Sequence, residues 1–127
     1  MIDVGTIESF GFGNDPVVIR NYVSGDKGGR VLDVTGFTEE YIRAGHVIIK
    51  ETATDTYKPM PVSDGAYAAL PEGHEYVGVA YSTKSVAEPF VAIMYAGTVN
   101  DVASPFPVDD IKAALKTALP TLVFNHD

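Results

Sequence analysis

The stretch "FVAIMYAGTVN", residues 90–100, is the strongest predicted strand in the chain and decides the fold class. β-Branched and aromatic residues fill it, as is typical of strands. Shorter strands are predicted on both sides of it, in "HVIIKE" (46–51), "TYKPMPV" (56–62), "EYVGVAYST" (75–83) and "TLVFN" (121–125). Because turn clusters separate these strands, the sequence predicts a mainly β (α+β) fold with a small curved sheet or barrel.

Two glycines, Gly78 and Gly97, fall inside these predicted strands. Glycine weakens a strand unless a bulge or a close approach of a neighbouring backbone requires it. Both residues therefore indicate a tightly curved sheet.

The part of the chain that precedes these strands is rich in turn residues. "PVVIRNYV" (16–23) predicts a strand, "SGDKGGR" (24–30) a glycine-rich turn, and "RVLDV" (30–34) a second short strand. We therefore expect a strand, a turn at the glycines and a second strand.

Two helices are predicted. Thr38 precedes two acids, which favours a short helix near residues 38–43 that a glycine then stops. A second helix is predicted near residues 108–119, where two acids open it and Pro120 ends it. Its apolar stripe consists of Ile111, Ala114, Leu115 and Leu119.

The composition limits the class of protein. The chain has 127 residues, which suits one compact unit, and we expect an N-terminal arm at residues 1–16 followed by a single β-rich domain at residues 17–127. A net charge of −8 repels nucleic-acid backbones and anionic lipid surfaces, so we expect neither nucleic acid nor membrane as a partner. The chain has no cysteine, which excludes thiolate chemistry. No export signal and no membrane-spanning run is visible, so we expect a soluble protein.

Histidines and acids raise the question of a catalytic or metal centre. His46 and His74 lie near acidic residues, but no two donors stand at a known ligand spacing. The further donors are Asp55, Asp64, Glu72, Glu75 and His126. We therefore predict no catalytic, cofactor-binding or metal-binding residue, and interpret both histidines as turn residues. A small metal-dependent hydrolase that uses His46 and His74 stays open as an alternative function.

Other patterns that can carry chemistry have simpler explanations. "SGDKGGR" lacks the residue order of a phosphate-binding loop. No serine occupies a nucleophile elbow. The acid pairs 39–40 and 109–110 each open a predicted helix, where the helix dipole favours negative charge. The sequence thus favours a protein that is not an enzyme and needs no cofactor.

Aromatic residues of the N-terminal arm suggest contact with a partner. Phe10 and Phe12 lie among glycines, with no predicted strand to hold them. Large apolar side chains in an arm can fill pockets on another protein, although an arm that folds back on its own domain is an equal alternative.

The order of the strand motifs resembles that of phage head decoration and head-fibre-base proteins. "IRAGHVIIKE" is followed by "TYKPMPV", "EYVGVAYST" and "FVAIMYAGTVN", and the chain closes with "IKAALKTALPTLVF". The similarity covers about residues 40 to 124.

This resemblance implies a β-rich unit that forms a trimer and stabilises a capsid through an extended N-terminal segment. Its partner would be the major capsid protein, and its location the virion surface after synthesis in the host cytoplasm. Residues 1–20 become the candidate contact segment, with Ile7, Phe10, Phe12 and Val17 as capsid-contacting residues. The resemblance makes these positions structural: Gly45, Val47, Pro59, Gly78, Val79 and Gly97.

A third function remains open. A curved sheet can hold a small molecule or glycan, with exposed tyrosines as stacking faces, in an oligomeric ligand-binding protein.

Overall fold

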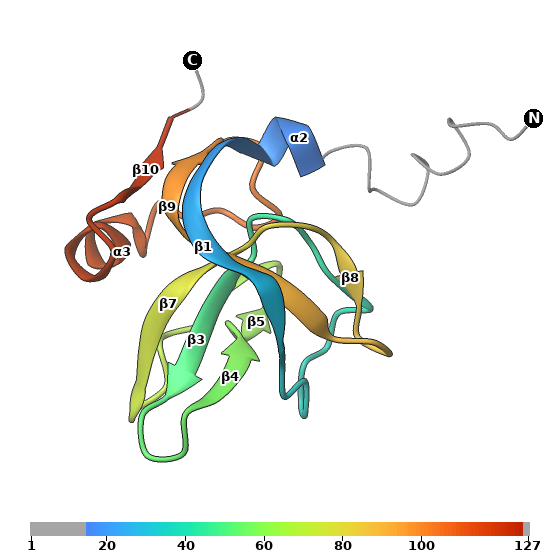
Figure 1. Cartoon of the computed structure of the whole chain (residues 1–127). Helices are drawn as coiled ribbons and strands as arrows, with labels where there is room; N and C mark the ends of the chain where they lie inside the picture. Colours follow the sequence, from blue (N-terminus) through green and yellow to red (C-terminus); the bar gives the residue numbers. More distant parts are fainter. Residues whose placement is uncertain (1–14, 126–127) are drawn as a thin grey trace, which may run out of the picture.

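The computed structural model describes residues 15–125, apart from the side chains at positions 15, 16 and 26–28, and Figure 1 shows its arrangement. The structure is 44% strand and 8% helical, which confirms the mainly β class. The helices are α2 (Asp15–Val18) and α3 (Lys112–Ala118). The strands are β1 (Ile19–Val31), β2 (Tyr41–Ile42), β3 (Val47–Glu51), β4 (Thr56–Pro59), β5 (Val62–Ser63), β6 (Ala66–Tyr67), β7 (His74–Ala80), β8 (Lys84–Ser85), β9 (Phe90–Val99) and β10 (Leu122–Phe124).

Strand β9, the strongest strand predicted from the sequence, organises the main sheet. The strand order is β1-β9-β7-β3-β4, and β10 also pairs with β9, in parallel. Along one edge β9 pairs with β1, and along the other it pairs first with β7 and then, from Gly97 onward, with β10. Two small sheets, β2–β8 and β5–β6, lie beside it.

The main sheet is open and uncurled, so the predicted curved sheet or barrel is wrong. Within residues 15–125, β1 and β4 form the two edges and do not pair with each other. The strand glycines that suggested curvature serve a different purpose. A side-chain carbon at Gly78 would lie 2.5 Å from the Met94 carbonyl oxygen, and one at Gly97 would collide with the Asn21 carbonyl oxygen. Both glycines therefore allow neighbouring backbones to approach closely, the second reason predicted for them.

The glycine-rich stretch 24–30 does not reverse the chain. It lies inside β1, which continues alongside β9 with several irregularities of register. A side-chain carbon at Gly25 would collide with the Ile93 carbonyl oxygen, so glycine is required by the neighbouring strand rather than by a turn. The residues before β1, predicted as the start of a strand, form the short helix α2 instead.

The short helix predicted near residues 38–43 is absent. Tyr41 and Ile42 form β2, which pairs with β8, and the Val86 backbone N–H donates to the Glu40 carbonyl at 3.1 Å. The Ile42 side chain is fully buried. Burial of this side chain and strand pairing outweigh the local capping preference of the preceding residues.

The C-terminal helix is confirmed but is shorter than the predicted range 108–119. Helix α3 begins at Lys112 after Ile111, whose side chain makes no capping hydrogen bond, and the two preceding acids lie before its first turn. Leu115 is fully buried, whereas Ala114 of the predicted stripe is exposed. A short helix that anchors one leucine suffices to lead the chain into β10.

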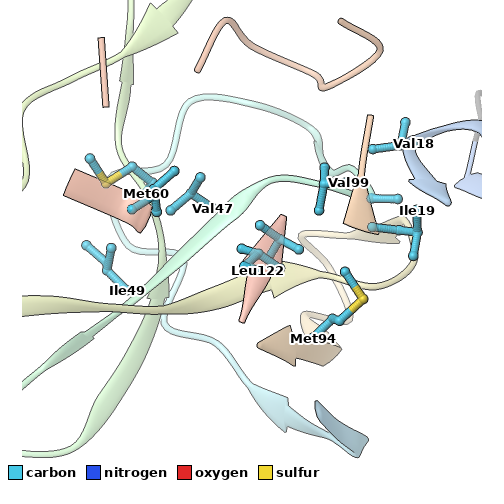
Figure 2. Packing of buried hydrophobic residues seen from close by; sticks show 11 residues of the cluster. Val18, Ile19, Val47, Ile49, Met60, Met94, Val99 and Leu122 are labelled. Atoms are coloured by element: carbon cyan, nitrogen blue, oxygen red, sulfur yellow. The ribbon is translucent and has the colours of Figure 1, made fainter. Parts of the chain in front are cut away.

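Apolar side chains pack on both faces of the sheet. Val47 and Ile49 belong to a first cluster, whereas Ile48 between them belongs to a second, as expected for side chains that alternate along a strand. Figure 2 shows the first cluster, whose members include Val18, Ile19, Met60, Met94, Val99, Leu115 and Leu122. The second cluster consists of Leu32, Ile42, Ile48, Ala80, Val91 and Ile93.

Candidate functional site

His46 lies in an aromatic enclosure. It follows a tight turn in which the His46 N–H donates to the Arg43 carbonyl at 2.9 Å and Gly45 has a φ of 87°, a conformation that favours glycine. The imidazole meets three rings edge to face, with centroid distances of 5.2 to 5.7 Å, from Phe37, Tyr67 and Phe106. The sequence placed His46 at a turn, but the structure buries it almost completely.

The chemistry of His46 is that of a structural donor. Burial lowers its pKa to about 4, and the weaker opposing effect is its hydrogen bond to the Met60 carbonyl. The ring is therefore neutral near pH 7, and its Nε2–H donates to that carbonyl at 2.9 Å. Tyr67 is held similarly: its hydroxyl accepts the Val47 N–H at 3.1 Å, and burial raises its pKa. Both side chains thus stabilise the core through hydrogen bonds to backbone groups.

His74 begins β7 and belongs to a polar chain at the sheet margin. Its Nδ1 lies 2.9 Å from the Glu72 carbonyl oxygen, and its Nε2 lies 3.3 Å from the Lys58 ammonium. In this geometry the Nδ1–H can donate to the carbonyl, and Nε2 can accept from the ammonium. Lys58 also donates to Glu51 at 3.2 Å. Both ring nitrogens of His74 thus lie within hydrogen-bonding distance of neighbouring groups of the fold.

A hollow of about 190 Å³ lies beside His74 and Lys58. Asp33 also lines it, and its carboxylate accepts the Thr35 N–H at 3.0 Å. Hydrogen bonds from the Thr35 side chain and backbone lower the pKa of Asp33. The polar groups of this hollow are therefore engaged with one another, which is typical of turn stabilisation.

The structure does not bring the two histidines together. His46 precedes the first residue of β3, whereas His74 pairs with Glu51, the last residue of that strand. Strand geometry separates the two positions by roughly 16 Å along β3. Within residues 15–125, no three His, Cys, Asp or Glu side chains gather to hold a metal ion. The geometry gives no support to a zinc centre built on this pair.

The acid pairs and the predicted arm have different outcomes. Neither acid pair opens a helix in the way predicted, because the first precedes β2 and the second lies before the first turn of α3. Of the predicted capsid-contacting residues, Ile7, Phe10 and Phe12 lie outside the described residues. Val17 is in α2, where its side chain is 52% exposed.

A further hollow, of about 390 Å³, is lined by three tyrosines, and we call it the tyrosine hollow. Its lining comprises Arg30, Tyr57, Tyr76, Val77, Ile93, Tyr95, Ala118, Leu119, Pro120 and Thr121. These residues come from β1, β4, β7, β9 and the end of α3 with the loop that follows. The site is thus assembled from five parts of the chain.

A cation rests on one aromatic wall of the tyrosine hollow. The Arg30 guanidinium carbon lies 5.0 Å from the ring centroid of Tyr57, within the range of a cation–π contact. The Lys50 ammonium lies 6.0 Å from the same ring and forms ion pairs with Asp55 and Glu75, both at 3.4 Å. Burial raises the pKa of Tyr76, so its hydroxyl stays protonated at neutral pH. Among the described residues of the lining, Arg30 is the one that is charged.

Sequence reasoning missed the tyrosine hollow as a site. It treated exposed tyrosines as possible stacking faces but had no means to group them, because about 19 residues separate each of the three along the chain. Only the strand order places β4, β7 and β9 close enough to share a concavity.

No family model, curated protein or solved structure matches the chain. No helix among the described residues is long and apolar enough to span a bilayer.

Proposed function

We propose that this chain is a non-enzymatic component of a phage head, which forms a homotrimer on the capsid surface and stabilises the shell. It acts by binding: an oligomer of the β-rich unit presents several N-terminal segments to neighbouring capsid subunits. Linked weak contacts raise the overall avidity by about 10²–10⁴ where the geometry permits simultaneous engagement.

The positions that the resemblance makes structural support the proposal. All six are buried: Gly45, Val47, Pro59, Gly78, Val79 and Gly97. Three of them are glycines at which a side chain would meet a neighbouring residue. Buried positions of this kind maintain the fold, so a function in binding depends on surface residues.

The observation that carries the proposal is an apolar pair at the end of β1. Val31 stands opposite Phe90 of β9, and their side chains are 71% and 53% exposed. Val23, on the same edge strand, is also exposed. Neighbouring exposed apolar side chains of this kind favour association with another protein surface.

The irregular edge of β1 supports association through side chains rather than through added strands. Regular edge strands offer rows of unpaired backbone groups, and bulges interrupt such rows. β1 changes register against β9 at four places. A closed oligomer that buries Val31 and Phe90 is therefore preferred to open-ended strand addition.

The solution mass of the full chain, measured by multi-angle light scattering, tests the oligomer. We expect a mass of three times the 13.6 kDa of the chain. Val31→Lys should shift the mass toward that of a monomer, because it places a charge in the apolar contact. Val102→Lys is the matched control, since Val102 is similarly exposed at 73% but lies in the turn that follows β9. A monomeric wild-type protein contradicts the proposal.

Capsid binding tests the N-terminal segment separately. Deletion of residues 1–14 should abolish co-sedimentation with assembled heads that lack this protein, while the solution mass per oligomer changes only by the deleted residues. Undiminished binding by the truncated protein would show that capsid contact lies elsewhere.

A further inference from the structure

The shape and lining of the tyrosine hollow are those of a small-molecule site. Its volume of about 390 Å³ falls within the range of about 300–1,000 Å³ typical of ligand pockets. Val77 and Ile93 supply apolar surface, and three tyrosines supply ring faces with polar tips. Tyr95 is the most accessible of them, with 43% of its side chain exposed.

The charge of the lining is unusual for this chain. The protein carries a net charge of −8, yet among the described residues that line the tyrosine hollow Arg30 is charged and none is acidic. A guanidinium has five N–H donors in a planar fork, so it can bind a carboxylate and still keep contacts within the protein. A ligand with one carboxylate is therefore complementary to this lining.

The polar tips of the walls indicate a ligand with hydroxyl groups. Tyr57, Tyr76 and Tyr95 each combine an aromatic face with a hydroxyl that donates and accepts hydrogen bonds. A sugar ring has apolar C–H faces to stack on tyrosine and hydroxyls to bond with tyrosine. A planar aromatic acid could stack and pair with Arg30, but it would leave the tyrosine hydroxyls without new partners.

We propose that the tyrosine hollow binds a carboxylate-bearing sugar, such as a uronic acid residue of a glycan. The carboxylate pairs with the Arg30 guanidinium, and the ring stacks on Tyr95 with its hydroxyls toward the other tyrosines. This binding site is independent of the proposed trimer and of the N-terminal segment, because every lining residue belongs to one described chain.

The first experiment is an NMR titration of the ¹⁵N-labelled full chain with methyl β-D-glucuronide, methyl β-D-glucoside and benzoate. We expect saturable shifts with the glucuronide that centre on the amides of Tyr57, Tyr95 and Thr121. The glucoside, which lacks the carboxylate, and benzoate, which lacks the hydroxyls, should each bind at least about tenfold more weakly. Equal binding of either control compound overturns the assignment of an acidic sugar, and the absence of saturable shifts overturns the site.

Matched variants test the two contacts. Arg30→Gln should weaken glucuronide binding at least about tenfold, because it removes a charge-assisted pair. Arg43→Gln is the control, since the Arg43 guanidinium also rests on a tyrosine, 5.6 Å from the Tyr41 ring centroid, outside the hollow. Tyr95→Ala should weaken binding and Tyr41→Ala should not. Arg30→Lys keeps the charge without the fork and should give intermediate binding.

An unchanged ¹H–¹⁵N spectrum in the absence of ligand verifies that each variant is folded. If Arg30→Gln is folded and binds glucuronide as wild type does, the carboxylate contact is wrong. Failure of this titration leaves the solution mass and capsid binding unaffected, so the two proposals fail separately.

Discussion

The two faces of the main sheet are completed in different ways. On one face the first cluster is closed by Met60, Leu115 and Leu122, which are almost fully buried. On the other face Leu32 and Ile42 cover part of the second cluster, and the tyrosine hollow opens beside Tyr57, Val77 and Ile93. Two further lining residues, Tyr76 and Leu119, pack against the first cluster. Both faces thus carry a buried cluster, and the face of the second cluster also keeps aromatic surface exposed at Tyr95.

Hydrogen bonding sharpens this difference. The enclosure of His46 lies beside the first cluster, and among the described residues no buried side-chain nitrogen or oxygen lacks a hydrogen-bond partner. In the tyrosine hollow, by contrast, the polar residues Arg30 and Tyr95 are exposed. We call the face of the first cluster the closed face and that of the second cluster the open face. Substitutions in either buried cluster should affect folding, whereas substitutions of exposed residues in the tyrosine hollow should affect binding.

The largest expected effect is on the closed face. Leu122→Ala should lower the free energy of unfolding by about 2–5 kcal/mol, because it removes a buried side chain from a packed site. Its neighbour Val123 is 48% exposed on the same strand and is the matched control. Val123→Ala should change the free energy by about 0.5 kcal/mol or less. Urea denaturation measures both, and equal losses would contradict the burial of Leu122 in the first cluster.

The pH dependence of stability tests the enclosure of His46. Its pKa is about 4 in the folded protein against an ordinary 6.5, so the unfolded chain binds a proton more readily. The stabilisation is complete above pH 6.5 and is lost as the pH falls from 6.5 through 4. It amounts to about 3 kcal/mol.

His46→Gln keeps a donor for the Met60 carbonyl but does not titrate. The difference in unfolding free energy between wild type and this variant should shrink or reverse between pH 7 and pH 4, as measured by denaturation at each pH. A parallel pH dependence for both proteins would show that His46 does not contribute to acid sensitivity.

A third effect tests the close backbone approach at Gly78. Gly78→Ala places a carbon 2.5 Å from the Met94 carbonyl oxygen, and the strand can relieve this contact only by moving. Gly73→Ala is the control: its φ of 76° favours glycine, but no atom beyond its chain neighbours lies within 4 Å of the added carbon. The control should cost about 1–2 kcal/mol. Thermal denaturation should rank Gly78→Ala as the more destabilising change.

These comparisons also show where sequence reasoning succeeds. Strands β3, β7, β9 and β10 and helix α3 follow from local patterns of β-branched residues, alternation and stop signals. The missing helix near residues 38–43 and the unbroken course of β1 through its glycines depend on pairing with β8 and β9. No local pattern encodes such a partner.

The same limit applies to the candidate sites. The histidines drew attention because of their chemistry, yet His46 is enclosed by aromatic rings and His74 is bound to its neighbours. The tyrosine hollow depends on the order of strands distant in sequence. Residue types suggested stacking, whereas the location of the site required the fold.

The smallest expected effect on stability concerns the open face. Tyr95→Ala should change the free energy of unfolding by about 0.5 kcal/mol or less, because the side chain is 43% exposed and leaves a hollow rather than a packed site. Urea denaturation of this variant beside Leu122→Ala compares the two faces directly. If Tyr95→Ala were as destabilising as Leu122→Ala, the tyrosine would act as a core residue, and its ring would not be available to a ligand. A near-neutral effect would mean that the exposed Tyr95 ring contributes little to the free energy of unfolding, as expected of a side chain that serves binding.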